Sequence, residues 1–178
     1  FEQFKLVAAD AAEDDDFGRT VAIDGDTVVV GEYRKDDETG AVYVLRASDG
    51  EELAKLTAAD AAPGDQFGWS VAIAGDTIVV GANTAGIGGA AYVFRTSDGG
   101  ATYGQVAKLT AADAAAGDNF GVSVAIDGGT IVVGARGHGY YDYGAAYVFR
   151  TTDGWTTHTE FKLTAADAGQ DDLSLIHI

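Results

Sequence analysis

The pattern of apolar and polar positions predicts short β-strands joined by tight turns. The first part of the chain contains four such strands, at residues 20–23, 27–30, 41–46 and 53–57. Asp24 and Gly25, between the first two, are a strong signal for a two-residue hairpin. The second strand is β-branched, as expected of a strand covered on both faces, and the third alternates, so that Tyr43 and Leu45 share one face. No helix is expected, because Gly interrupts every long apolar stretch.

This four-strand pattern is repeated along the chain. Lys-Leu-Thr-Ala-Ala-Asp-Ala occurs identically at residues 55–61, 108–114 and 162–168, and in a related form at 5–11. Phe-Gly recurs at 17–18, 67–68 and 120–121, each time followed by Val-Ala-Ile and then by Val-Val-Gly. Four antiparallel strands in each repeat of about 50 residues are typical of a β-propeller blade. We therefore expect an all-β fold made of propeller blades.

Blades bury their faces against neighbouring blades, so the repeat also predicts the core. The small residues of Val-Ala-Ile suit an innermost strand, where the backbone is crowded near the axis. Large side chains of the third strands are expected to fill the gaps between blades: Tyr43, Tyr92, Tyr147, Leu45, Phe94 and Phe149.

The repeats also give the domain boundaries. We expect the last strand and loop of a preceding blade at residues 1–16, and three four-stranded blades at 17–66, 67–119 and 120–172. Residues 173–178 match nothing upstream and are expected to be a non-native or unstructured tail. A closed seven-bladed ring needs about 350 residues at about 50 per blade. The chain of 178 residues is thus interpreted as a fragment of a seven-bladed propeller.

The repeats resemble FG-GAP repeats, the propeller repeats of integrin α-subunits and many bacterial surface proteins. The residues that carry the resemblance are the three Phe-Gly pairs and Gly31-Glu32, Gly81-Ala82 and Gly134-Ala135. The resemblance implies an extracellular or cell-surface binding or adhesion module with a protein or carbohydrate ligand. The calcium-binding form of the family carries Asp-x-Asp-x-Asp-Gly between the first two strands. Here the short turns at 24–26, 74–76 and 127–129 offer too few oxygens for calcium, which indicates the calcium-loop-less bacterial branch, without metal or cofactor.

Composition excludes several classes of function. The chain has 11 Lys+Arg and 28 Asp+Glu, a net charge of −17, and its cations are scattered singly, so we expect no nucleic-acid partner. No apolar run approaches the roughly 20 residues needed to cross a bilayer, so no membrane insertion is expected in this segment. The absence of cysteine removes thiolate catalysis and disulfides.

Enzymatic motifs are missing as well. The sequence has no Gly-x-Ser-x-Gly elbow, no His-Glu-x-x-His and no phosphate-binding glycine loop. With 28 acidic residues, any pair chosen for glycoside hydrolysis is uninformative, and Val-Ala-Ile carries no charge. We expect no enzyme. The alternatives are a purely structural propeller domain of a larger secreted protein, or the non-catalytic part of a propeller hydrolase or lyase. A quinoprotein-like propeller lacks support, because no tryptophan recurs in each repeat.

The loops between second and third strands differ most among the repeats. They cover residues 32–39, 82–88 and 135–143 and should share one rim with the loops between blades. Tyrosine in the third loop suits recognition, because it offers contact area and a hydroxyl, although packing at blade edges is the alternative. The candidate ligand-binding residues are Tyr33, Arg34, Asn83, Arg136, His138, Tyr140, Tyr141 and Tyr143.

Acidic residues gather in the loops on the same rim and are interpreted as solvated surface. Four of them share one repeat position, which suggests caps of turns through Asx hydrogen bonds: Asp10, Asp60, Asp113 and Asp167. Blades at the ends of a sector expose apolar faces. Self-association through the open blade edges, or marginal stability, is therefore expected.

Overall fold

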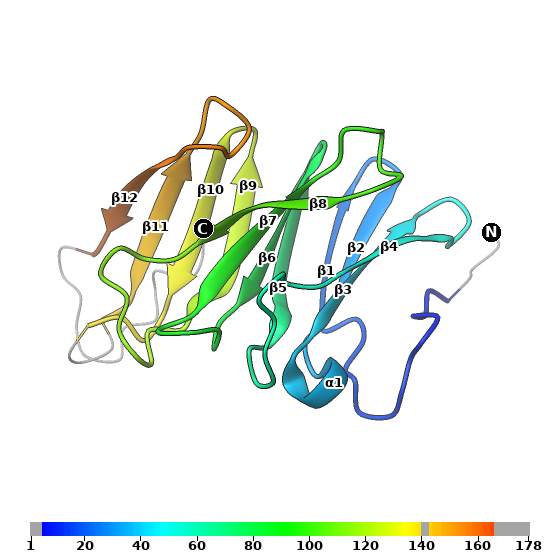
Figure 1. Ribbon diagram of the computed structural model, residues 1–178, viewed down its shortest axis with the longest axis horizontal. Coiled ribbons are helices and arrows are strands. Elements are labelled where there is room, and N and C mark those ends of the chain that lie inside the picture. The colour runs from blue at the N-terminus through cyan, green and yellow to red at the C-terminus, as the bar shows by residue number, and fades with distance from the viewer. Residues whose placement is uncertain (1–4, 140–142, 166–178) are drawn as a thin grey trace.

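The structure, a computed structural model, describes residues 5–139 and 143–165 (Figure 1). It contains three four-stranded antiparallel sheets in which consecutive strands are neighbours. Blade 1 consists of β1 (Thr20–Asp24), β2 (Thr27–Glu32), β3 (Ala41–Arg46) and β4 (Glu52–Leu56). Blade 2 consists of β5 (Phe67–Ala74), β6 (Thr77–Ala82), β7 (Ala90–Arg95) and β8 (Gly104–Leu109). Blade 3 consists of β9 (Phe120–Asp127), β10 (Thr130–Ala135), β11 (Ala145–Arg150) and β12 (Thr159–Leu163).

The all-β, propeller-like arrangement of about three blades is confirmed, with blade 2 between blades 1 and 3 (Figure 1). The strands of blade 1 match the expected ones to within about two residues, since β-branched and alternating patterns are local properties. One short helix, α1 (Lys35–Glu38), was not expected. It is a single irregular turn between β2 and β3, in which Asp36 and Asp37 have φ of 51° and 58°. Among the described residues, no helix is long and apolar enough to span a membrane.

The Phe-Gly pairs join each blade to the one before it. Phe67 begins β5, and the pairing of β5 with β6 shifts register between Phe67 and Ser70. The Phe67 amide donates to the carbonyl of Thr39, in the loop of the preceding blade, at 3.1 Å. The Phe120 amide makes the equivalent bond to Gly88 at 2.7 Å. The irregular starts of β5 and β9 therefore hydrogen-bond to the preceding blade.

The core lies between the blades, where the sequence pattern places it. Phe67 contacts Tyr92 and Phe94 edge-on, with ring centroids 5.5 Å and 5.9 Å apart, and these rings pack against valines of blade 1. Phe120 repeats this arrangement with the aromatic side chains of β11. The six expected gap-filling residues are all buried. The inner strands β1, β5 and β9 lie next to one another, as the small residues of Val-Ala-Ile predicted.

The N-terminal segment lies on the outer face of blade 1. Residues 5–16, the described part of the segment expected to supply a strand of a preceding blade, form no strand. Leu6 and Ala8 instead lie against Tyr43 and Leu45 of blade 1. The tail at 173–178 lies outside the described residues.

Candidate functional site

Hydrogen bonds sort the loops between two rims. The loop after β2 and the loop between blades 1 and 2 are joined by bonds from the Gly64 amide to Asp37 O, at 3.1 Å, and from the Gln66 amide to Glu38 O, at 2.8 Å. We call their side the variable rim, made of residues 33–40, 57–66, 83–89, 110–119, 136–139 and 143–144. The opposite side, the hairpin rim, carries the turns at 25–26, 75–76 and 128–129 and the loops at 47–51, 96–103 and 151–158. This is the arrangement that the strand order predicted.

A polar triad stands on the variable rim at the position of Asp10. Tyr43 of β3 donates its hydroxyl to Asp10 Oδ1 at 2.6 Å, and Lys55 of β4 donates to Oδ2 at 2.5 Å. The Lys55 ammonium also lies 5.4 Å from the centroid of the Tyr43 ring. The hydrogen bond from Lys55, followed by that from Tyr43, lowers the pKa of Asp10 to about 2. Burial is the largest cause that raises the pKa of Tyr43.

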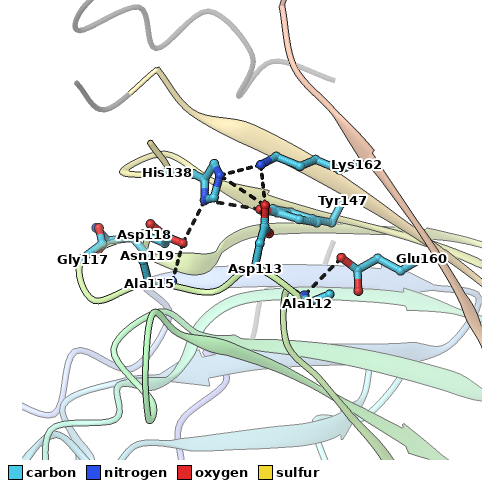
Figure 2. A network of polar contacts seen from close by, with 10 residues as sticks. All are labelled: Ala112, Asp113, Ala115, Gly117, Asp118, Asn119, His138, Tyr147, Glu160 and Lys162. Atoms are coloured by element: carbon cyan, nitrogen blue, oxygen red, sulfur yellow. Dashed lines mark hydrogen bonds and ion pairs between the residues drawn. The ribbon is translucent and has the colours of Figure 1, made fainter. Parts of the chain in front are cut away.

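The triad is repeated in full in blade 3 and in part in blade 2. In blade 3, Tyr147 and Lys162 donate to the two oxygens of Asp113 at 2.7 Å and 2.6 Å (Figure 2). In blade 2, Lys108 donates to Asp60 at 2.5 Å, but the buried Tyr92 hydroxyl has no hydrogen-bond partner in the described structure. Each aspartate comes from the loop that precedes its blade, and each lysine from the last strand of that blade. The triad therefore fixes the incoming loop to the outer edge of the blade.

The interpretation of these aspartates as turn caps is wrong for Asp10 and Asp113, whose oxygens bind tyrosine and lysine side chains. Carboxylates five residues further along the chain accept from the loop amides instead. Asp15, Asp65 and Asp118 accept from the amides three residues before them at 2.8–2.9 Å. The tyrosine and lysine partners lie more than 30 residues away in sequence, so local spacing gave no sign of them.

The fourth residue after the glycine of each Val-Val-Gly lies on the variable rim and differs from blade to blade. In blade 1 it is Lys35, which is buried and donates to Asp15 at 2.7 Å. In blade 3 it is His138, whose Nδ1 lies 2.9 Å from Asp118 and whose Nε2 lies 2.5 Å from Lys162 Nζ (Figure 2). Because an ammonium only donates, Nε2 accepts and Nδ1 carries the proton. In blade 2 the position is an alanine.

Two of the candidate ligand-binding residues lie in a cluster of cations and rings. Tyr33 is buried and packs edge-on against Trp69, with ring centroids 4.9 Å apart. Arg34 lies over the Tyr33 ring at 5.5 Å and its Nε is 3.4 Å from Asp16. Arg19 lies 5.5 Å from the centroid of the Trp69 ring. The cluster joins blades 1 and 2 at the variable-rim end of the inner strands.

Sequence reasoning missed Arg19 and Trp69. Both follow a Phe-Gly pair, and the third repeat has Val122 there. A comparison of the residues that follow the three Phe-Gly pairs would have found them. A position that differs among the repeats is not part of the packing that all the repeats share.

The remaining candidates are spread over the rim. Asn83 is buried and its side chain donates to Asn119 Oδ1 at 3.5 Å, and His138 is held by the triad of blade 3. Arg136 is exposed, and Tyr143 is half-buried. Tyr140 and Tyr141 lie outside the described residues. Tyr33 and Arg34 are thus brought together, whereas Asn83 is not at the surface.

Acidic side chains of the rim face cations. Asp10, Asp15 and Asp16 contact Lys55, Lys35 and Arg34. Within residues 5–139 and 143–165, no group of three or more His, Asp or Glu side chains is arranged to hold a metal ion. That the protein uses no cofactor stays a prediction.

Comparison with known proteins identifies the repeat. The model of the FG-GAP repeat matches residues 1–45, 47–94 and 103–149. Among solved structures, Saccharomyces cerevisiae Sqt1 superposes with a TM-score of 0.57 and 9% identity, over 88% of this chain and 37% of that one. A europium-containing methanol dehydrogenase gives a TM-score of 0.49 and 12% identity, over 78% of this chain and 23% of that one.

The chain thus spans little more than a third of Sqt1, and at 9% identity this likeness concerns the fold alone. No curated protein matches the sequence. The three family matches fall on successive repeats and together cover well over half of the residues. The chain belongs to the FG-GAP repeat family.

Proposed function

We propose that the chain is a non-enzymatic, extracellular or cell-surface binding module whose protein or carbohydrate ligand is contacted by the loops of the variable rim. The observation that carries this proposal is a set of three exposed arginines: Arg34 and Arg136 in loops of the variable rim, and Arg19 directly before β1. Their positions differ in residue type from repeat to repeat, while the framework around them is constant. In a chain of net charge −17, exposed arginines favour recognition, and two of these three, Arg19 and Arg34, lie beside aromatic rings.

Membership of the FG-GAP repeat family also supports a binding function. FG-GAP repeats build propellers, and propellers commonly recognise ligands through rim loops carried on a rigid scaffold. The Val-Ala-Ile segments of the inner strands carry no charged side chain, which favours binding over catalysis. Arginine and tryptophan are enriched among the residues that carry binding energy in interfaces.

A purely structural role is the second candidate, and a specific observation favours it. Tyr33 and Asn83 are buried, and His138 is held by its neighbours. Three of the variable positions therefore serve packing within the chain. The non-catalytic part of a propeller hydrolase or lyase remains a further alternative.

The test uses the immobilised chain and a panel of extracellular ligands: heparin, hyaluronan, chitin oligosaccharides, collagen and fibronectin. We expect saturable binding to at least one of them, weakened about tenfold or more by Arg136→Ser. Arg150→Ser is the matched control, since Arg150 is also exposed but ends β11 at the hairpin rim.

Absence of saturable binding, or equal losses in the two variants, would favour the structural role. Release of fragments from any polysaccharide in the panel would contradict the non-enzymatic part of the proposal.

A further inference from the structure

A hollow of about 280 Å³ opens on the hairpin rim, where the turns of blades 2 and 3 meet. Blade 2 contributes Thr77 and Arg95, from the start of β6 and the end of β7. Blade 3 contributes residues 128–129, 151–152 and 154–155. The hollow lies on the opposite rim from the proposed ligand loops, so a ligand here would be distinct from theirs.

Arg95 is a cation without a counter-charge. Its Nε is fully buried and has no hydrogen-bond partner, and its guanidinium makes no ion pair within the described part of the chain. The guanidinium lies close against Gly154 of blade 3, where a Cβ would be 2.4 Å from its Nη1. A positive charge that is partly removed from water without a counter-charge is unfavourable, and an anion in the hollow would balance the charge of the guanidinium.

The equivalent arginine of blade 1 is neutralised by its own loop. Arg46 Nη1 contacts Asp49 Oδ2 at 3.0 Å and also forms an ion pair with Glu51. These contacts raise the pKa of Arg46 further above its ordinary value, and the hydrogen bond that Arg46 donates to Asp49 is the largest cause. A similar hollow lies beside Arg46, but there the arginine is already paired with two carboxylates of its own chain.

In blade 2 no carboxylate at these two positions pairs with the arginine. Gly100 occupies the repeat position of Glu51. Asp98, which corresponds to Asp49, instead accepts from Thr102 Oγ1 at 2.6 Å and from Thr96 Oγ1 at 2.7 Å. These hydrogen bonds, those from Thr102 first, hold the pKa of Asp98 well below its usual range and turn its carboxylate into its own loop.

We propose that this hollow binds the carboxylate of a hexuronic acid unit, with the Arg95 guanidinium as its partner. The planar fork of arginine matches a carboxylate through two parallel hydrogen bonds. Thr77 and Thr152 line the hollow with hydroxyls that bond to nothing else in residues 5–139 and 143–165, and they suit the hydroxyls of a sugar ring. A singly charged acid is favoured over phosphate, because the field of a chain of net charge −17 opposes each added negative charge.

The first experiment titrates the 178-residue chain with glucuronate, glucose and acetate at constant ionic strength. Amide NMR signals of Gly128, Gly129 and Gly154 and the Trp155 indole report on the hollow. We expect saturating shifts with glucuronate, and affinities for glucose and acetate lower by about tenfold or more. If glucose bound as tightly as glucuronate, the proposed role of the carboxylate would be overturned. If acetate bound as tightly as glucuronate, the proposed recognition of the sugar ring would be overturned.

The second experiment compares Arg95→Gln with Arg150→Gln, the exposed arginine at the same repeat position of blade 3. Arg95→Gln should weaken glucuronate binding about tenfold or more, and Arg150→Gln should leave it unchanged. Unchanged binding by Arg95→Gln would overturn the proposal. If Arg95→Gln does not fold, the titration of the wild type with glucuronate, glucose and acetate decides whether the proposal holds. Arg136→Ser, on the other rim, should not affect glucuronate binding, which separates this proposal from the proposed function.

Discussion

Glu32, at the end of β2, occupies a position that the other blades fill with Ala82 and Ala135. Its side chain is fully buried, and neither carboxylate oxygen has a hydrogen-bond partner in the described structure. Burial is the largest cause that raises the pKa of Glu32, and the nearby Lys35 opposes it. The repeat thus tolerates one unfavourable charge beside the triad of blade 1.

Glu32→Gln should stabilise the protein at about pH 7 by on the order of 1 kcal/mol, because it keeps the shape and removes a buried charge. The pKa of Glu32 is raised in the folded state above its unfolded value of about 4.3. The wild type therefore keeps this stability below the unfolded pKa and loses it as the pH rises through the folded pKa. The gain should vanish below about pH 4, as measured by urea unfolding at both pH values.

Glu13→Gln is the matched control, since Glu13 is exposed, and it should change stability little at either pH. A loss of stability in Glu32→Gln at neutral pH would mean that the attraction between Glu32 and Lys35 outweighs the cost of burial.

At the scale of the elements, neighbouring blades approach backbone to backbone. A Cβ on Gly81 of β6 would lie 2.0 Å from the carbonyl oxygen of Gly121 in β9. A Cβ on Gly31 of β2 would lie 2.2 Å from the carbonyl oxygen of Gly68 in β5. Backbone atoms cannot turn aside as a side chain can. Gly31 and Gly81 are therefore required where the second strand meets the inner strand of the next blade.

Gly81→Ala should destabilise the protein by about 3 kcal/mol or more, because the methyl group forces two blades apart. Gly104→Ala, in the outer strand β8, is the control, since a Cβ there meets no atom within 4 Å. Its effect should stay within about 0.5 kcal/mol in the same chemical unfolding experiment. Equal stability of the two variants would show that the blades can separate without loss.

At the scale of the whole molecule, blade 1 presents an apolar hollow of about 670 Å³ lined by residues 5–8 and by β1 and β2. Val21 and Ile23 of β1 are 64% and 65% exposed in it. Val71, the counterpart of Val21 in blade 2, is only 8% exposed, because blade 1 covers it. The repeat thus builds a packing surface on every blade, and that of blade 1 is only partly covered by the described residues.

We expect the chain to self-associate through this surface, since exposed apolar patches of this kind drive association. The mass measured by light scattering after size-exclusion chromatography should rise with concentration. Val21→Ser together with Ile23→Thr should lower it, whereas Ile87→Thr, at a 72% exposed site outside the hollow, should not. A monomer at every concentration would contradict the expectation.

Much of the fold could be predicted from the sequence, and less of the site. Strand positions and the buried Tyr43 and Phe94 follow from alternation and repetition along single strands. The burial of Tyr33, by contrast, depends on Trp69 in the next blade, which no local pattern indicates. The structure assigns three of the proposed recognition residues to packing or to the triads, and leaves exposed arginines that lie on the same rim.

The sequence by itself determined the family, the number of blades described and the composition of the gaps between them, because each depends on a pattern that recurs within one repeat. Only the tertiary structure decided which charges are paired. Asp10 finds Tyr43 and Lys55 across 33 and 45 residues, and Arg95 is left without a partner where Arg46 has two. Such contacts depend on the register of strands and on the packing of one blade against the next, and neither is a property of neighbouring residues in the chain.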